Sequence, residues 1–200
     1  PVPTISAALD ARFLSAIKDQ RVQAADCFPS KPQVLIAGKR EVLEKLEKAL
    51  YASKLCAYAQ GMAVIAAGSQ EYKWGIDKAE VCRIWKGGCI IRSKLLDVVQ
   101  DVFEDCSDIK NLLLDRKISA LILGLENDWR TLVTSAESVT IPTLSMSASL
   151  RYFDAFRTEN LPLNLTQAQR DFFGAHTYCR VDDPERKDVH TDWKRSKEKG

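Results

Sequence analysis

Apolar side chains recur at helical spacing along most of the chain, and this pattern predicts an all-α fold. The first predicted helix runs from Thr4 to about Ala25. Its apolar residues return at every fourth position, which predicts a single buried stripe. The stripe consists of Ile5, Leu9, Phe13 and Ile17.

The longest predicted helix begins at Lys39 or Arg40 and continues to about Gly68. From Ala49 to Ser69, eleven of twenty-one residues are Ala, Ser or Gly. Small residues let neighbouring helices approach closely, so this half is predicted to be the central helix of the domain. Alternating steps of three and four residues also form a helical seam along it, at Leu43, Leu46, Leu50, Ser53, Ala57, Gly61 and Val64.

The rest of the chain predicts shorter helices joined by short loops, as in a helical bundle. Asp77 is a predicted N-cap for a helix that ends at Trp85, and Asp108 is one for the segment 111–114. Further helices are predicted over 89–104, 115–135 and 144–158, and Thr166 is the predicted cap of the last one. The apolar face of the helix over 115–135 is predicted to consist of Ile118, Leu121, Ile122, Leu125, Trp129, Leu132 and Val133. No stretch alternates apolar and polar residues in a sustained way, and no GxGxxG is present. The chain is therefore predicted to lack a Rossmann nucleotide-binding domain.

Composition narrows the class of protein further. The hydrophobic fraction of 46% supports a real core, and a net charge of +2 does not favour nucleic acid as a partner. No segment reaches the roughly 20 apolar residues that a membrane span needs. Six cysteines match no zinc pattern, and most are predicted to be buried, reduced thiols. We therefore expect no metal and a cytoplasmic location, and the opening Pro-Val-Pro is typical of the interior of a longer protein.

Candidate chemistry concentrates near the end of the last predicted helix. Both histidines lie in the last 25 residues and neither is near a GxSxG, which argues against a hydrolase. Arg170 and His176 are six positions apart. An arginine can hold a phosphate or carboxylate with two parallel hydrogen bonds, and a histidine adds a tunable donor. A purely structural role, with Asp171 as the salt-bridge partner of Arg170, is an equal alternative on these residues alone.

Three long motifs resemble the C-terminal, all-helical part of 6-phosphogluconate dehydrogenase, the decarboxylating enzyme of the pentose phosphate pathway. They are ALYASKLCAYAQG at 49–61, IWKGGCIIRS at 84–93 and LTQAQRDFFGAHTY at 165–178. The segment ARFLSAIKDQRVQA at 11–24 adds weaker support. The similarity is collinear over about residues 2 to 193. Lys86 departs from the family, which usually has an arginine at this position, so a bidentate contact there would be weakened.

The resemblance implies an enzyme that uses NADP and no metal to convert 6-phosphogluconate into ribulose 5-phosphate and carbon dioxide. The family's catalytic lysine and glutamate, and its NADP-binding domain, lie upstream of residue 1, so no catalytic residue is expected in this chain. The resemblance further implies substrate binding by Arg12, Arg170 and His176, with the last two acting in the partner subunit's site. Residues 1–176 would then be a substrate-binding and dimerisation domain, and 177–200 a tail that reaches the partner. The expected assembly is a homodimer, with a dimer of dimers as the alternative.

Two other readings of the residues stay open. One is a helical dimerisation or interaction module without catalysis. By itself, the chain is expected to be inactive. A relative acting on a different 3-hydroxy acid is less favoured, because the family's phosphate-binding arginines match Arg12 and Arg170. Without the resemblance, Arg12 would be read as an ordinary solvated or salt-bridged helix residue.

Overall fold

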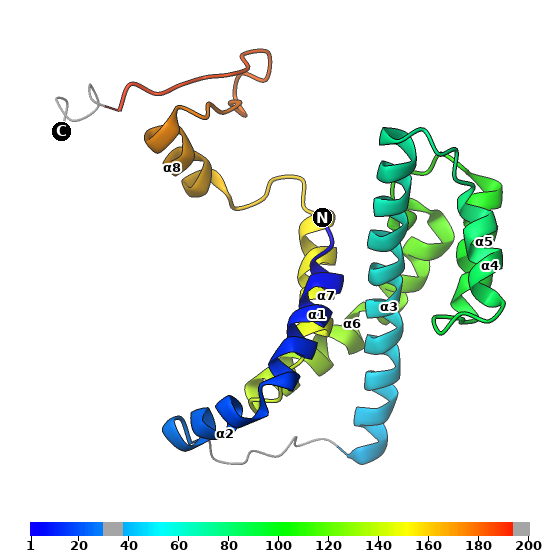
Figure 1. Cartoon of the computed structure of the whole chain (residues 1–200). Helices are drawn as coiled ribbons and strands as arrows, with labels where there is room; N and C mark the ends of the chain where they lie inside the picture. The colour runs from blue at the N-terminus through cyan, green and yellow to red at the C-terminus, as the bar shows by residue number, and fades with distance from the viewer. Residues whose placement is uncertain (30–37, 194–200) are drawn as a thin grey trace. The chain divides into compact units, whose positions relative to one another are not determined.

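A computed structural model describes residues 1–29 and 38–193 of the chain (Figure 1). The described residues form eight α-helices and one short 3₁₀ helix, η1, which confirms the predicted all-α fold. Their contacts divide the chain into two compact units, Pro1–Asp154 and Ala155–Gly200, and each is described here by itself. The elements are α1 (Pro3–Ala16), α2 (Lys18–Cys27), α3 (Lys39–Glu71), α4 (Lys78–Lys86), α5 (Leu95–Asp105), η1 (Leu112–Leu114), α6 (Arg116–Ser138), α7 (Leu144–Phe156) and α8 (Asn164–Gly174).

Helix α3 is the central helix of the first unit, as the small residues of its second half predicted. It packs against α6, η1 and α1, while α4 and α5 pair side by side (Figure 1). Its buried face is built largely from small residues, which let these neighbours approach closely. The buried residues of α3 are Ala49, Ala52, Ser53, Leu55, Cys56, Ala59, Gln60 and Met62.

The seam of α3 is helical as predicted, but most of it is not the buried face of the helix. Leu43 and Leu50 are more than half exposed, at 54% and 52%, and Val64 is similarly exposed. Of the seven predicted positions only Ser53 is buried. Periodicity finds apolar faces, but it cannot tell which of two such faces is covered within the same chain.

The first helix is shorter than predicted, and its apolar stripe is not buried. The backbone leaves helical geometry at Ile17, with φ −91° and ψ 54°, so that α2 begins at Lys18. The stripe from Ile5 to Ile17 is exposed, with Phe13 at 64%. The buried contact is instead made by Thr4, because α1 approaches α3 through a face of small residues.

A pair of hydrogen bonds joins the start of α1 to the middle of α3. The Thr4 backbone N–H donates to Gln60 Oε1 at 3.0 Å, and Gln60 Nε2 donates to Thr4 Oγ1 at 2.8 Å. Ser145 Oγ on α7 donates to the Thr4 carbonyl at 3.1 Å. The Gln60 side chain is fully buried, and this pairing satisfies its amide there.

The helix boundaries follow local capping chemistry, which the sequence predicted only in part. Asp77 caps α4 as predicted, since its side chain accepts from the N–H groups of residues 79 and 80. Asp108 is not a cap, because Asn111 caps η1 and Asp115 caps α6. Residues 89–94 form turns rather than a helix, so α5 starts at Leu95 and not at the predicted Cys89.

The core of the first unit is completed by α6 and α7. Trp129 is fully buried and lies 6.1 Å from Phe153 between ring centroids. The predicted apolar face of α6 is largely confirmed, with Ile118, Ile122, Leu132 and Val133 all buried. Among the described residues, no helix is both long enough and apolar enough to cross a membrane.

The cysteines differ from their predicted burial. All six are free, but only Cys56 and Cys82 are buried, while Cys27, Cys106 and Cys179 are exposed. Burial raises the pKa of the Cys56 thiol to about 12 and that of Cys82 to about 11. The two buried thiols therefore stay protonated and act as small apolar side chains.

Candidate functional site

Helix α8 organises the second unit by presenting two opposite faces. It starts at Asn164, after Leu163 in the N-cap position, so Thr166 lies inside the helix and is not its cap as predicted. Positions 164, 168 and 171 lie on one side of a helix with 3.6 residues per turn, and positions 166, 170 and 173 lie on the other. The first side is covered by the tail, and the second side presents Arg170.

The chain leaves α8 through two left-handed residues that flank His176. Ala175 has φ 50° and ψ 41° and caps the helix, and its N–H donates to the Asp171 carbonyl at 2.9 Å. Thr177 has φ 59°. Glycine is the usual residue in this conformation, which is unfavourable for side chains with a Cβ by roughly 1–2 kcal/mol per residue. His176 is therefore displayed by a tight turn that other contacts must stabilise.

Arg170 and His176 line the same surface depression, as the anion-site hypothesis requires. The depression has a volume of about 430 Å³ and is lined by Thr166, Gln169, Arg170, Phe173, Gly174 and His176. Arg170 and His176 are both exposed. Among residues 1–29 and 38–193, no hydrogen bond or ion pair engages the Arg170 guanidinium or the His176 ring.

The alternative partner of Arg170, Asp171, is engaged elsewhere. Its side chain is fully buried, on the opposite side of the helix. Oδ1 accepts from Thr177 N at 3.1 Å and from His190 Nδ1 at 2.9 Å, and Oδ2 accepts from Thr191 N and Trp193 Nε1, each at 3.0 Å. The alternative of a salt bridge between Asp171 and Arg170 is thus not realised in the structure, and the guanidinium stays available to a ligand.

These four donors explain the ionisation of Asp171. Burial by itself raises the pKa of a carboxyl group, but the hydrogen bonds from Thr191, His190 and Trp193 outweigh it and lower the pKa of Asp171 to about 2. A carboxylate can only accept, so His190 Nδ1 carries the proton that it shares with Asp171. The buried group is consequently an anion at any physiological pH.

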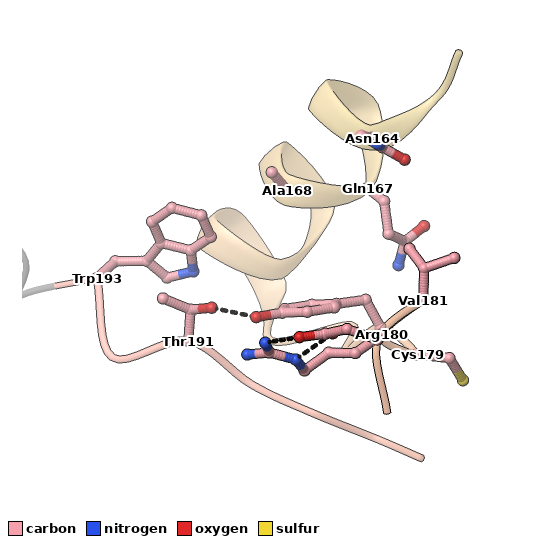
Figure 2. A pocket seen from close by; sticks show the side chains of 10 residues that line it. Asn164, Gln167, Ala168, Cys179, Arg180, Val181, Thr191 and Trp193 are labelled. Carbon is pink, nitrogen blue, oxygen red and sulfur yellow. Dashed lines mark hydrogen bonds and ion pairs between the residues drawn. The ribbon is translucent and has the colours of Figure 1, made fainter. Parts of the chain in front are cut away.

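The tail that covers α8 is built around a short antiparallel pairing. Tyr178 and Val189 exchange backbone hydrogen bonds of 2.9 and 3.0 Å, and the Tyr178 hydroxyl lies 2.6 Å from Thr191 Oγ1. Figure 2 shows a second hollow here, with Gln167 and Ala168 of α8 facing Arg180 and Trp193 of the tail. Arg180 is paired with Asp182, so its charge is already neutralised.

Arg12, the third predicted substrate ligand, belongs to the other unit. It lies on α1, its side chain is exposed, and no hydrogen bond or ion pair is formed by it among the described residues. Sequence reasoning identified the Arg170 and His176 pair but missed Asp171. No local signal reveals this role, because three of the four donors come from residues 190–193, far along the chain.

The first unit also has a hollow of about 500 Å³ beside α3, lined by Lys54, Tyr58, Trp85 and Arg92 among others. The Tyr58 hydroxyl donates to the Ile91 carbonyl at 2.7 Å. Lys86 pairs with Asp97 at 2.8 Å. Within the described ranges, no group of three or more His, Cys, Asp or Glu side chains is placed to hold a metal ion.

The fold and the site together define a helical domain with an exposed cationic depression and no dinucleotide-binding sheet in the part that the structure describes. The family described as "6-phosphogluconate dehydrogenase, C-terminal domain" matches residues 1–193. The chain belongs to this family, which confirms the resemblance drawn from the motifs.

Individual relatives agree with this membership. The chain is 48% identical to "6-phosphogluconate dehydrogenase, decarboxylating 1" of Oryza sativa subsp. japonica, over 96% of its length and 40% of the relative's. It is 46% identical to the decarboxylating 6-phosphogluconate dehydrogenase of Synechocystis, again over 96% and 40%. Among solved structures, Plasmodium falciparum 6-phosphogluconate dehydrogenase, studied in its apo form and in complex with NADP+ and with 6-phosphogluconate, is similar with a TM-score of 0.89 and 38% identity. The chain covers 41% of that protein, so it spans about two fifths of the relatives that it matches.

Proposed function

We propose that this chain is the C-terminal, substrate-binding part of an NADP-dependent 6-phosphogluconate dehydrogenase of the pentose phosphate pathway. The complete enzyme oxidises 6-phosphogluconate and releases carbon dioxide, giving ribulose 5-phosphate. The names of the relatives and the family membership support this assignment. A soluble, cytoplasmic enzyme that needs no metal is part of the same proposal.

One observation carries the substrate site. Arg170 and His176 lie in one exposed depression, and the acidic neighbour that would neutralise Arg170 is turned to the other side of α8. A guanidinium that is not paired can hold two phosphate oxygens, and the imidazole adds a further donor. In the proposed enzyme this pair binds the substrate's phosphate, and Arg12 is a further phosphate ligand.

The rest of the catalytic machinery is proposed to lie outside this chain. The described residues contain no strand and no dinucleotide-binding turn, so they do not fit the role of an NADP site. NADP and the catalytic lysine and glutamate are accordingly assigned to an N-terminal domain that precedes residue 1.

The proposed assembly is a homodimer in which each tail serves the partner's active site. Support comes from two apolar faces that the isolated chain leaves exposed. One is the stripe of α1 that includes Leu9 and Phe13, and the other is the seam of α3 that includes Leu43 and Leu50. Contiguous apolar surface of this kind marks interaction sites in soluble proteins. Sedimentation of the 200-residue chain tests it, and a stable folded monomer would contradict the proposal.

The substrate site is tested in a complete subunit, with an NADP-binding domain preceding this chain. Arg170→Ala and His176→Ala should each raise KM for 6-phosphogluconate, by about 10- to 150-fold for the arginine, since a hydrogen bond to a charged group contributes about 1.5–3 kcal/mol. Arg180→Ala is the matched control, because Arg180 is already paired with Asp182 and does not line the depression. Unchanged KM in both site variants would refute the assignment of Arg170 and His176 to the substrate site.

A further inference from the structure

We infer that Asp171 and Gly174 are positioning residues that hold the His176 imidazole beside Arg170. Neither is assigned a contact with the substrate. This inference rests on the proposed function, because it explains how that site is kept in shape. It is carried by three separate features of the C-terminal unit: the bonds of a buried carboxylate, the backbone on either side of His176, and the space above a glycine.

The Asp171 carboxylate ties two separate parts of the tail to one point of α8. Thr177, the residue directly after His176, donates its backbone N–H to Oδ1 at 3.1 Å. The other three donors come from His190, Thr191 and Trp193. The Asp171 carboxylate therefore holds both the residue that follows His176 and the later segment 190–193, which comes directly after the pairing of Val189 with Tyr178.

The backbone around His176 needs such an anchor. Ala175 and Thr177 both have positive φ, at 50° and 59°. A β-branched residue with positive φ is an outlier that persists only where surrounding contacts determine it. The hydrogen bond from Thr177 N to Asp171 is that contact. It fixes the backbone next to His176 and so the direction in which the His176 side chain points.

Gly174 then decides where the imidazole can lie. A Cβ at this position would come within 3.1 Å of both Cδ2 and Nε2 of His176. The ring thus packs directly over the glycine, at the end of the helix that carries Arg170. Gly174 has no positive φ, so alanine is compatible with its backbone and would displace only the ring.

Together these features make His176 a preorganised ligand rather than a mobile one. A site that is held in its binding geometry before the substrate arrives gives higher affinity, because less ordering is needed on binding. Loss of either positioning residue should therefore weaken substrate binding while the ligating side chains remain present.

The first test is Asp171→Asn in the complete subunit. Asparagine keeps the shape but turns an NH2 group toward two donors. We expect KM for 6-phosphogluconate to rise about 10-fold, in line with the sensitivity of sites to small displacements. Asp182→Asn is the matched control, since it changes the same residue type in the same unit, but at an exposed position that pairs with Arg180 and not with the residues around His176. It should leave KM unchanged.

A double-mutant cycle separates positioning from a general structural role. If Asp171 acts through the Arg170 and His176 pair, Asp171→Asn should have no further effect on KM in an Arg170→Ala/His176→Ala background. An equal rise in both backgrounds would overturn the inference. If the Arg170→Ala/His176→Ala variant binds substrate normally, the proposed function itself fails. If that variant binds weakly but Asp171→Asn alone does not, only the positioning role fails.

Gly174→Ala keeps the inference testable if Asp171→Asn does not fold. Removing a glycine near a helix end should not lower the melting temperature, yet KM should rise about 3- to 10-fold because the ring is displaced. Gly124→Ala is the matched control, because no atom lies within 4 Å of a Cβ at that position on α6. Equal kinetics for the two alanine variants would overturn the role of Gly174.

Discussion

The interlock between Thr4 and Gln60 gives the sharpest prediction for stability. Gln60→Ala removes two hydrogen bonds between residues 56 positions apart, at 3.0 and 2.8 Å. It also leaves the Thr4 N–H and hydroxyl, on a residue only 4% exposed, without partners. Two lost bonds contribute about 1 kcal/mol each, and an unsatisfied buried donor costs a further 1–3 kcal/mol. We expect a loss of roughly 3–5 kcal/mol in the free energy of unfolding.

Urea denaturation of the 200-residue chain, followed by circular dichroism, measures this loss. With an m-value of about 2 kcal/mol/M, the midpoint should fall by about 1.5–2.5 M. Gln70→Ala is the control, because Gln70 lies on the same helix but is exposed. A double-mutant cycle with Thr4→Val should show coupling between the two side chains, since they form one network. Equal midpoints for the two alanine variants would refute the argument that this interlock anchors α1.

Three further predictions test the caps, the core and the tail. Asp77→Ala should destabilise the chain by about 1 kcal/mol in urea denaturation, because the Asp77 side chain caps α4. Asp108→Ala should have no such effect, because Asn111 and not Asp108 caps η1. Trp129→Ala should cost about 3–5 kcal/mol, since this ring is fully buried in the core, and a loss below 1 kcal/mol would contradict that packing. The pKa of Asp171 is lowered from 3.8 to about 2. The contribution of this carboxylate to the free energy of unfolding is therefore complete above pH 4 and is lost as the pH falls toward 2. The Trp193 indole N–H resonance, bonded to that carboxylate, should therefore keep its shift from pH 7 to 4 and move only below pH 4, and a change near pH 6 would be inconsistent with this.

The two faces of α8 show why the candidate site could be predicted only in part. Arg170 and Asp171 are neighbours in sequence, and from sequence alone a salt bridge between them is reasonable. On a helix, consecutive side chains point about 100° apart, so one can be buried while the next is exposed. Which of them is covered depends on the path of the tail, and that path is defined by donors about 20 positions further along.

The sequence by itself determined the helical class, the central position of α3, the cap at Asp77 and the apolar face of α6. These follow from spacing, residue size and short-range hydrogen bonding, which act within a few residues of one another. Only the tertiary structure decided that α1 packs through Thr4 instead of its apolar stripe, and that the Leu43–Leu50 side of α3 stays exposed. It also decided that Asp171 holds the tail while Arg170 stays unpaired. Burial and pairing depend on which distant segments meet, and the local pattern carries no information about that.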